Sequence, residues 1–172
     1  MRVKFGIAAV AAVALVSGCG DSTAVESESE RPVMFEPCDD IPDEAIAELG
    51  FDPATADRGV AGVDQWGWGI CKWSGETHNI AISYAERSLE SLRDTGNNTD
   101  IRHVGEPTPE AHTWRRLGEE EFICEVTWPN GTGAGQLTVY KRPGADGERM
   151  TENICDAAVG YAIALGDLLP RG

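Results

Sequence analysis

Long apolar runs and basic residues are both scarce in this chain of 172 residues. No stretch reaches 18 consecutive apolar residues, so the sequence predicts no membrane-spanning helix. The chain has 14 basic and 29 acidic residues, which give a formal net charge of −15. An acidic surface repels nucleic-acid phosphates and anionic lipid headgroups. We therefore expect no nucleic-acid partner and no polybasic attachment to a membrane surface.

Motifs that carry chemistry are missing as well. The cysteines form no C-x-x-C pair and have no histidine within a few residues, so we expect no metal and no cofactor. No serine lies in a G-x-S-x-G context, and the glycines of 131–135 lack the lysine of a phosphate-binding loop. His78, His103 and His112 have no ligand spacing, and the acidic run 119–121 is interpreted as a solvated turn. The sequence therefore predicts no catalytic residue and disfavours an enzyme.

Residues 1–18 have the layout of a lipoprotein signal peptide. Arg2 and Lys4 precede the apolar segment 5–16, whose roughly 12 residues are too few to span a bilayer. Two small residues then precede Cys19, and this arrangement resembles the lipobox of bacterial lipoproteins. In that pathway the cysteine sulfur receives a diacylglycerol, and cleavage makes this cysteine the new N-terminus. The alternative interpretation is an ordinary secretory signal with a cysteine nearby.

Lipidation of Cys19 would anchor the mature chain to the cell membrane from the extracytoplasmic side. Several acyl chains on one residue make release negligible, because each buried methylene contributes roughly 0.8 kcal/mol. Residues 19–32 contain serine and glutamate but almost no large apolar side chains, which predicts a flexible acidic tether. Residues 33–172 are enough for a single folded domain with one core.

The hydrophobic pattern of residues 33–172 predicts an α+β fold. We expect helices over 39–49 and 86–95, and a final helix over 150–168 whose apolar residues step by three and four. Strands are expected over 69–74, 79–85, 101–105, 112–117 and 121–128, with a returning strand around 137–139. The segment 52–64, rich in glycine and aspartate, is interpreted as a loop. The expected order α-β-β-α-β-β-β-α gives an antiparallel sheet packed against helices.

Four cysteines remain besides Cys19, and an even number in an exported domain predicts two disulfides. Cys38 precedes the first expected helix, and Cys71 lies in the first expected strand. Cys124 lies on the inward face of its strand, and Cys155 lies beside the apolar stripe of the last helix. We therefore favour the pairs Cys38–Cys71 and Cys124–Cys155, each of which fastens a helix to the sheet. The crossed pairings stay open.

The stretch 66–73 is apolar on both sides if it is extended, with Trp66 and Trp68 on the same side. This pattern predicts either a loop folded over the core or an exposed tryptophan patch. Exposed aromatic clusters mark surfaces that bind partners or ligands. Trp114 is a second candidate because two arginines follow it in a chain where clustered basic residues are rare. Trp66, Trp68 and Trp114 are therefore the candidate binding surface.

The cysteine pattern also carries a family resemblance. Pro37-Cys38 precedes a helix, Cys71-Lys72-Trp73 lies in a strand, and single cysteines follow in a late strand and the last helix, all behind the lipobox. Over roughly 35–170 the chain resembles the actinobacterial lipoproteins grouped as domain of unknown function 3558. The resemblance implies an exported, lipid-anchored domain. It implies no catalytic residues, because the family is functionally uncharacterised.

These observations favour a non-catalytic binding or interaction module of the cell envelope. Its expected partners are the membrane, through the lipid on Cys19, and another envelope protein or a small ligand. One alternative is an envelope hydrolase, for which a cleft gathering His103 or His112 with acidic residues would be the support. Another is a carrier of a hydrophobic ligand, which would require an apolar cavity between the sheet and the helices.

Overall fold

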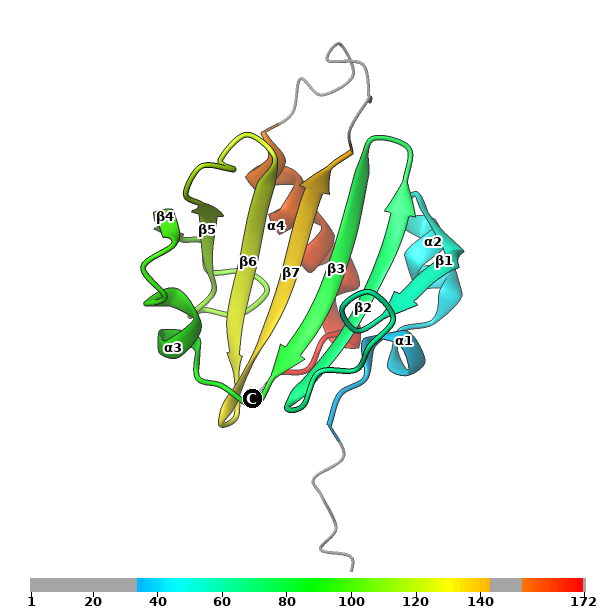
Figure 1. Cartoon of the computed structure of the whole chain (residues 1–172), viewed down its shortest axis with the longest axis horizontal. Coiled ribbons are helices and arrows are strands. Elements are labelled where there is room, and N and C mark those ends of the chain that lie inside the picture. Colours follow the sequence, from blue (N-terminus) through cyan, green and yellow to red (C-terminus); the bar gives the residue numbers. More distant parts are fainter. Residues whose placement is uncertain (1–33, 143–152, 172) are drawn as a thin grey trace, which may run out of the picture. The chain divides into compact units, whose positions relative to one another are not determined.

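An antiparallel sheet organises the part of the chain that the computed structural model describes, residues 34–142 and 153–171. Within these residues the sheet has seven strands in the order β1-β2-β3-β7-β6-β5-β4 (Figure 1). The strands are β1 (Phe51–Arg58), β2 (Trp68–Gly75), β3 (His78–Ala85), β4 (Asn98–His103), β5 (His112–Arg116), β6 (Ile123–Asn130) and β7 (Gly133–Lys141). The predicted α+β class is confirmed.

The helices are short except for the last one. They are α1 (Pro37–Asp40), α2 (Asp43–Glu48), α3 (Leu89–Arg93), α4 (Ile154–Leu165) and the 3₁₀ turn η1 (Gly166–Leu168). No helix within the described ranges has the length and apolarity needed to cross a bilayer. Cys19, the expected signal peptide, the expected tether and the first residues of the expected final helix lie outside the described residues.

The main departure from the sequence-based expectation is β1, which lies where a loop was predicted. Its middle residues are exposed because β1 is an edge strand, paired only with β2, and its register shifts between Asp52 and Asp57. An exposed and irregular edge strand lacks the apolar alternation that identifies a strand in sequence. The four strands that follow α3 match the four ranges predicted there, so the expected order was one strand short at this point. Ile41-Pro42 separates the first expected helix into α1 and α2.

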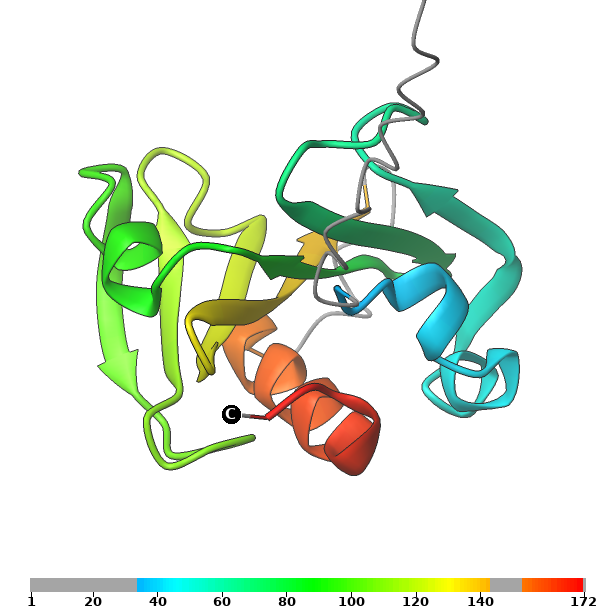
Figure 2. The same ribbon diagram turned by 90° about the horizontal axis from the view of Figure 1, so that it is seen from below.

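Strand alternation gives the sheet a back face that is covered by helices. Figure 2 shows α1, α2 and α4 on the same side of the sheet. The antiparallel register aligns Cys71, Ile82, Leu137 and Val126 in one row on this face, and all four residues are buried. The main hydrophobic core therefore lies between the back face and these three helices.

Both predicted disulfides are present. Cys38–Cys71 joins α1 to β2, and Cys124–Cys155 joins β6 to α4. Their sequence separations are 33 and 31 residues, for which loop-closure entropy predicts a stabilisation of roughly 3–4 kcal/mol per bond. Each bond fastens a helical segment to the sheet, as the sequence layout indicated.

The contact between Trp128 and Gly135 provides a test of the core. The two residues are paired across β6 and β7, and a β-carbon added to Gly135 would collide with the Trp128 ring. We expect Gly135→Ala to lower the free energy of unfolding by about 1–3 kcal/mol, because the buried ring has no room to shift. Chemical denaturation of the disulfide-bonded protein measures this change.

The matched control is Gly160→Ala in α4. An added β-carbon at position 160 meets no atom within 4 Å. Since alanine favours a helix over glycine by up to about 1 kcal/mol, this variant should be as stable as the parent or more stable. Equal losses in the two variants would contradict the proposed collision.

Candidate functional site

The front face of the sheet, opposite α4, carries a polar row instead of an apolar core. Register pairing across six strands aligns Asp57, Lys72, Ala81, Thr138, Glu125 and Trp114. We call these six residues the front row. The two central residues, Ala81 and Thr138, have small side chains. Charged side chains lie on either side of them, the Asp57 and Lys72 pair toward one end and Glu125 toward the other. This face is the first candidate site.

Glu125 anchors one end of the front row, and its side chain is only 2% exposed. Arg116 donates to Glu125 Oε1 through Nε at 2.8 Å and Nη2 at 2.6 Å. Gln136 Nε2 donates to Oε2 at 2.9 Å, and Trp114 Nε1 donates to the same oxygen. Both carboxylate oxygens are thus occupied by donors of the chain itself. This arrangement holds β5, β6 and β7 together and leaves the carboxylate no free acceptor site for a substrate proton.

Trp114 does not form an exposed surface, and the hypothesis that placed it in the binding surface is corrected. Trp114 is 1% exposed and packs with Leu92 in a small cluster on the front face. The arginines that follow it are engaged within the fold. Arg116 binds Glu125, and Arg115 donates to Asn153 Oδ1 at 2.8 Å. The two arginines that follow Trp114 therefore form hydrogen bonds within the fold instead of a basic surface patch.

Trp66 and Trp68 are separated by the turn at Gly67, whose φ of 73° lies in the left-handed region. Trp66 is 92% exposed, whereas Trp68 is partly buried and packs against the cluster that contains Trp114. The expectation that both side chains lie on one extended face therefore fails, because position 67 is not extended. Of the three tryptophans in the predicted binding surface, Trp66 is exposed, whereas Trp68 is partly buried against the cluster that contains Trp114.

Trp66 belongs to a loop over residues 59–67, which we call the 59–67 loop. Val60 and Val63 bond to each other through both backbone groups, at 2.9 and 3.1 Å, and enclose a two-residue turn. Ala61 and Gly62 have φ angles of 53° and 75°, as a tight hairpin turn of this kind requires. Both valines are more than half exposed. A short hairpin thus presents two valines to solvent in the same loop as Trp66.

The structure also brings together two histidines that the sequence left unconnected. His103 and His112 are paired across β4 and β5, with ring centroids 5.3 Å apart. His103 Nε2 lies at the Pro109 carbonyl, and His112 Nδ1 lies 2.8 Å from the Glu110 carbonyl. Each ring therefore has one nitrogen held by backbone, and this pairing could be inferred only from strand register. His103 also lines a pocket with Asp100 and Asp156, the gathering that the hydrolase alternative requires. That pocket has a volume of only about 140 Å³, below the range of small-molecule sites, and its Asp100 is paired with Arg102 and Arg115. No group of three metal-ligating side chains occurs within residues 34–142 and 153–171.

His78, the remaining histidine, lies at the start of β3 on the back of the sheet. Its Nδ1 is 2.9 Å from Thr77 Oγ1, and its ring meets Tyr161 of α4 edge-on with centroids 6.3 Å apart. The acidic run at 119–121 lies in the connection between β5 and β6 and is exposed or partly exposed. These positions associate His78 with the packing of α4 and the acidic run with the solvated edge.

The Glu125 network yields a stability prediction. Arg116→Ala removes the charged partner of a buried carboxylate, which leaves that carboxylate with only two neutral donors. We expect a loss of about 1–3 kcal/mol in unfolding free energy, less than for a fully buried pair because Arg116 is 49% exposed. The control Arg102→Ala breaks a surface pair with Asp100, in which the Arg102 side chain is 66% exposed, and should leave the unfolding midpoint unchanged. Equal stability of both variants would contradict a structural role for the network.

Comparison with known proteins gives a family and no activity. The family model described as "Protein of unknown function (DUF3558)" matches residues 14–167. No curated protein and no solved structure matches the chain. The match covers most of the 172 residues, including both disulfides and the whole sheet. The chain therefore belongs to the DUF3558 family.

Proposed function

We propose that this protein is a non-catalytic interaction module of the cell envelope, lipid-anchored outside the cytoplasm, that binds another envelope protein through the 59–67 loop. The exposure of Trp66 is the observation that carries the proposal. A tryptophan side chain at 92% exposure contributes little to the fold and leaves a large apolar area in water. Tryptophan is also among the residues most enriched at binding hot spots.

The geometry of the loop supports binding to a protein surface. Val60 and Val63 add two exposed apolar side chains on a hairpin that is held by two backbone hydrogen bonds. A hairpin ordered in this way loses little conformational entropy when a partner covers it. Asp64 lies in the same loop, and the chain as a whole is strongly acidic, so an anionic lipid surface is a poor partner.

Several observations support a location outside the cytoplasm. Two disulfides are typical of proteins in an oxidising compartment. The resemblance of the residues around Cys19 to a lipobox is the basis for proposing a lipoprotein, with a signal peptide over 1–18 and a tether over 19–32. The cysteine pattern of the domain is the basis for proposing that it is actinobacterial. A tether of about 15 flexible residues has an average reach of roughly 20 Å. The domain would thus act on partners close to the membrane.

The 59–67 loop lies near the residues where the described domain begins. Met34 and Glu86 line the same pocket, and the Glu86 N–H donates to the Gly67 carbonyl at 3.0 Å. Met34, the first residue that the structure describes, therefore lies at the end of the sheet that carries the loop.

The anchor is tested by Cys19→Ala. Without the thiol no diacylglycerol can be attached, so we expect the protein to move from the membrane fraction to the soluble extracytoplasmic fraction. Cell fractionation followed by immunodetection measures the distribution. Cys19→Ser serves as a second variant of similar size. Membrane retention of both variants would refute the lipid anchor.

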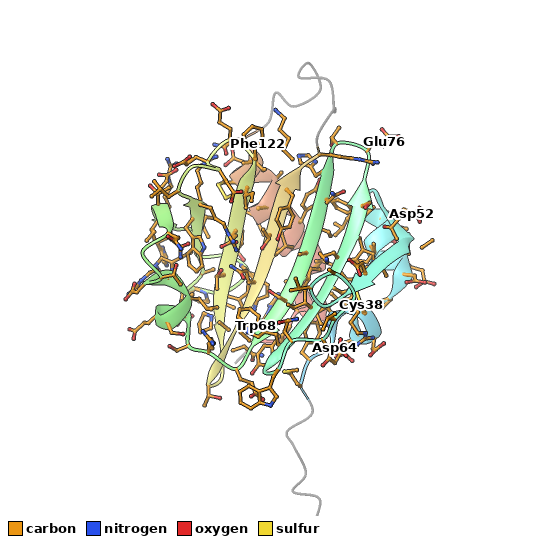
Figure 3. The ribbon with its side chains drawn as sticks, viewed as in Figure 1. Cys38, Asp52, Asp64, Trp68, Glu76 and Phe122 are labelled. Carbon is orange, nitrogen blue, oxygen red and sulfur yellow. A yellow bond between two sulfur atoms is a disulfide. The ribbon has the colours of Figure 1, made fainter. Side chains whose placement is uncertain are left out.

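The loop is tested by placing a photo-crosslinking amino acid at position 66 in cells. We expect one discrete crosslinked envelope protein, whose yield falls on introduction of Val60→Ser and Val63→Ser. Phe122 provides the matched control, because it is an exposed aromatic residue beyond the other end of the sheet from Trp68 (Figure 3). Crosslinks of equal yield and identity from positions 66 and 122 would contradict a specific loop contact.

Purified protein gives a quantitative version of this test once that partner is identified. We expect Trp66→Ala to weaken binding by more than tenfold, in line with a hot-spot loss of about 2 kcal/mol. The melting temperature should not change, because the Trp66 side chain is almost fully exposed. Phe122→Ala should leave the affinity unchanged. A large stability loss in Trp66→Ala would assign the residue to the core instead.

A further inference from the structure

A pocket on the front face lies at the end of the front row away from Glu125. Its volume is about 460 Å³, within the range of small-molecule sites. Six of the residues that line it are Thr55, Asp57, Lys72, Ser74, Asn79 and Tyr140. They come from β1, β2, β3 and β7, so the pocket is built on paired strands and does not depend on a loop. We call it the front-face pocket.

Two of the three charged residues that line this pocket are paired with each other. Lys72 Nζ lies 2.8 Å from Asp57 Oδ2, and both side chains keep part of their surface in solvent. This pair offers ammonium donors and carboxylate acceptors with no net charge, and Lys141 is the third charged residue of the lining. The acidic balance of the rest of the chain disfavours an anionic ligand. A neutral ligand rich in both donors and acceptors fits this electrostatic setting.

Asn79 supplies an independent sign of a ligand. Its Oδ1 is buried and has no hydrogen-bond partner among the described residues. A buried acceptor left without a donor costs about 1–3 kcal/mol. Because this oxygen has almost no accessible surface, a ligand hydroxyl or amide N–H can satisfy it only once the side-chain amide turns toward the pocket. Asn79 lies opposite Ser74 in the β2–β3 pairing, so an amide and a hydroxyl lie side by side on the pocket floor.

Tyr140 forms another part of the lining and lies opposite Asn79 across β3 and β7. Burial, followed by the negative charge of Glu125, raises the pKa of Tyr140 above its ordinary value. The phenol thus stays protonated at physiological pH and can donate a hydrogen bond. Its aromatic ring can also pack against C–H groups, a surface that the polar neighbours do not provide.

From these features we propose that the front-face pocket binds a neutral saccharide. Sugar hydroxyls donate and accept at once, which suits the Lys72–Asp57 pair and the open Asn79 acceptor. The C–H face of a sugar ring suits the aromatic ring of Tyr140. The pocket is open to solvent and can take one unit of a longer glycan whose other units extend outside. This site is independent of the 59–67 loop and of the lipid anchor.

The probes are cellobiose and N,N′-diacetylchitobiose, titrated into the full chain in detergent micelles with both disulfides intact. We expect saturable binding by calorimetry with at least one disaccharide, and NMR shift changes that centre on Asn79, Lys72 and Tyr140. Asn79→Ala and Tyr140→Phe should each weaken that binding by about tenfold, the loss expected for one hydrogen bond. Asn79→Leu, which has a similar volume but no acceptor, covers the case in which the alanine variant misfolds and should weaken binding to the same extent.

Asn130→Ala is the matched control, since Asn130 lines a different pocket together with Tyr84. It should leave sugar affinity unchanged. Sodium acetate tests the competing class of ligand and should give no shift changes at the three pocket residues. The proposal is overturned if neither disaccharide binds at its solubility limit, if acetate binds at these residues more tightly than the sugars, or if sugar shifts map outside the pocket. These results bear on the pocket alone, because the crosslinking experiment tests the loop separately.

Discussion

The pairing of β3 with β7 is the constraint on which the rest of this domain depends. These strands are not neighbours in sequence, yet they pair over eight consecutive positions and join β1–β3 to β4–β7. Since side chains alternate across a sheet, a slip of one residue would exchange the core face with the polar face. The register therefore fixes the back core, the front row and the front-face pocket together. Each disulfide then braces one side of this central pairing.

The two faces of the sheet are formed by the same strands but are stabilised in different ways. On the back face, apolar residues and helices remove surface from water, which stabilises the fold in proportion to the area buried. On the front face, Glu125 is buried at a position where an apolar residue would be easier to accommodate. Its four hydrogen bonds compensate for the lost hydration and couple β5, β6 and β7. Specific polar pairing thus orders a face that has little helical cover.

Much of the architecture followed from the sequence, because it rests on local patterns. Strand alternation and the stripe of the last helix predicted the α+β class, and the cysteine positions favoured both disulfides, whereas the structure was needed to exclude the crossed pairings. Edge strand β1 was missed because its exposed residues carry no alternation. Trp114 was assigned to the surface because its neighbouring arginines look like a basic patch, while Glu125, the acidic partner of Arg116, lies in another strand. A lone glutamate inside the apolar strand β6 was the available signal for that partner.

The candidate site was harder to predict from the sequence, because it depends on contacts between residues of separate strands. The Lys72–Asp57 pair, the open acceptor of Asn79 and the paired rings of His103 and His112 all arise from register between strands. No local pattern predicts which residues of separate strands lie opposite each other. The exposure of Trp66 depends on the turn at Gly67, which interrupts an apparently extended segment. The positions of the candidate site residues are thus set mainly by pairing between strands that are distant in sequence.

The Cys38–Cys71 bond also has a mechanical consequence. Cys38 lies only four residues after Met34, the first residue that the structure describes, and the bond joins it to a central position of β2. Tension applied to the preceding chain would pass through the disulfide into β2 before it could unwind α1 and α2. Strand β2 is hydrogen-bonded on both sides, so the load would be shared by several bonds acting in parallel. The position of this disulfide makes the N-terminal end of the domain a point at which it can be pulled without being unravelled.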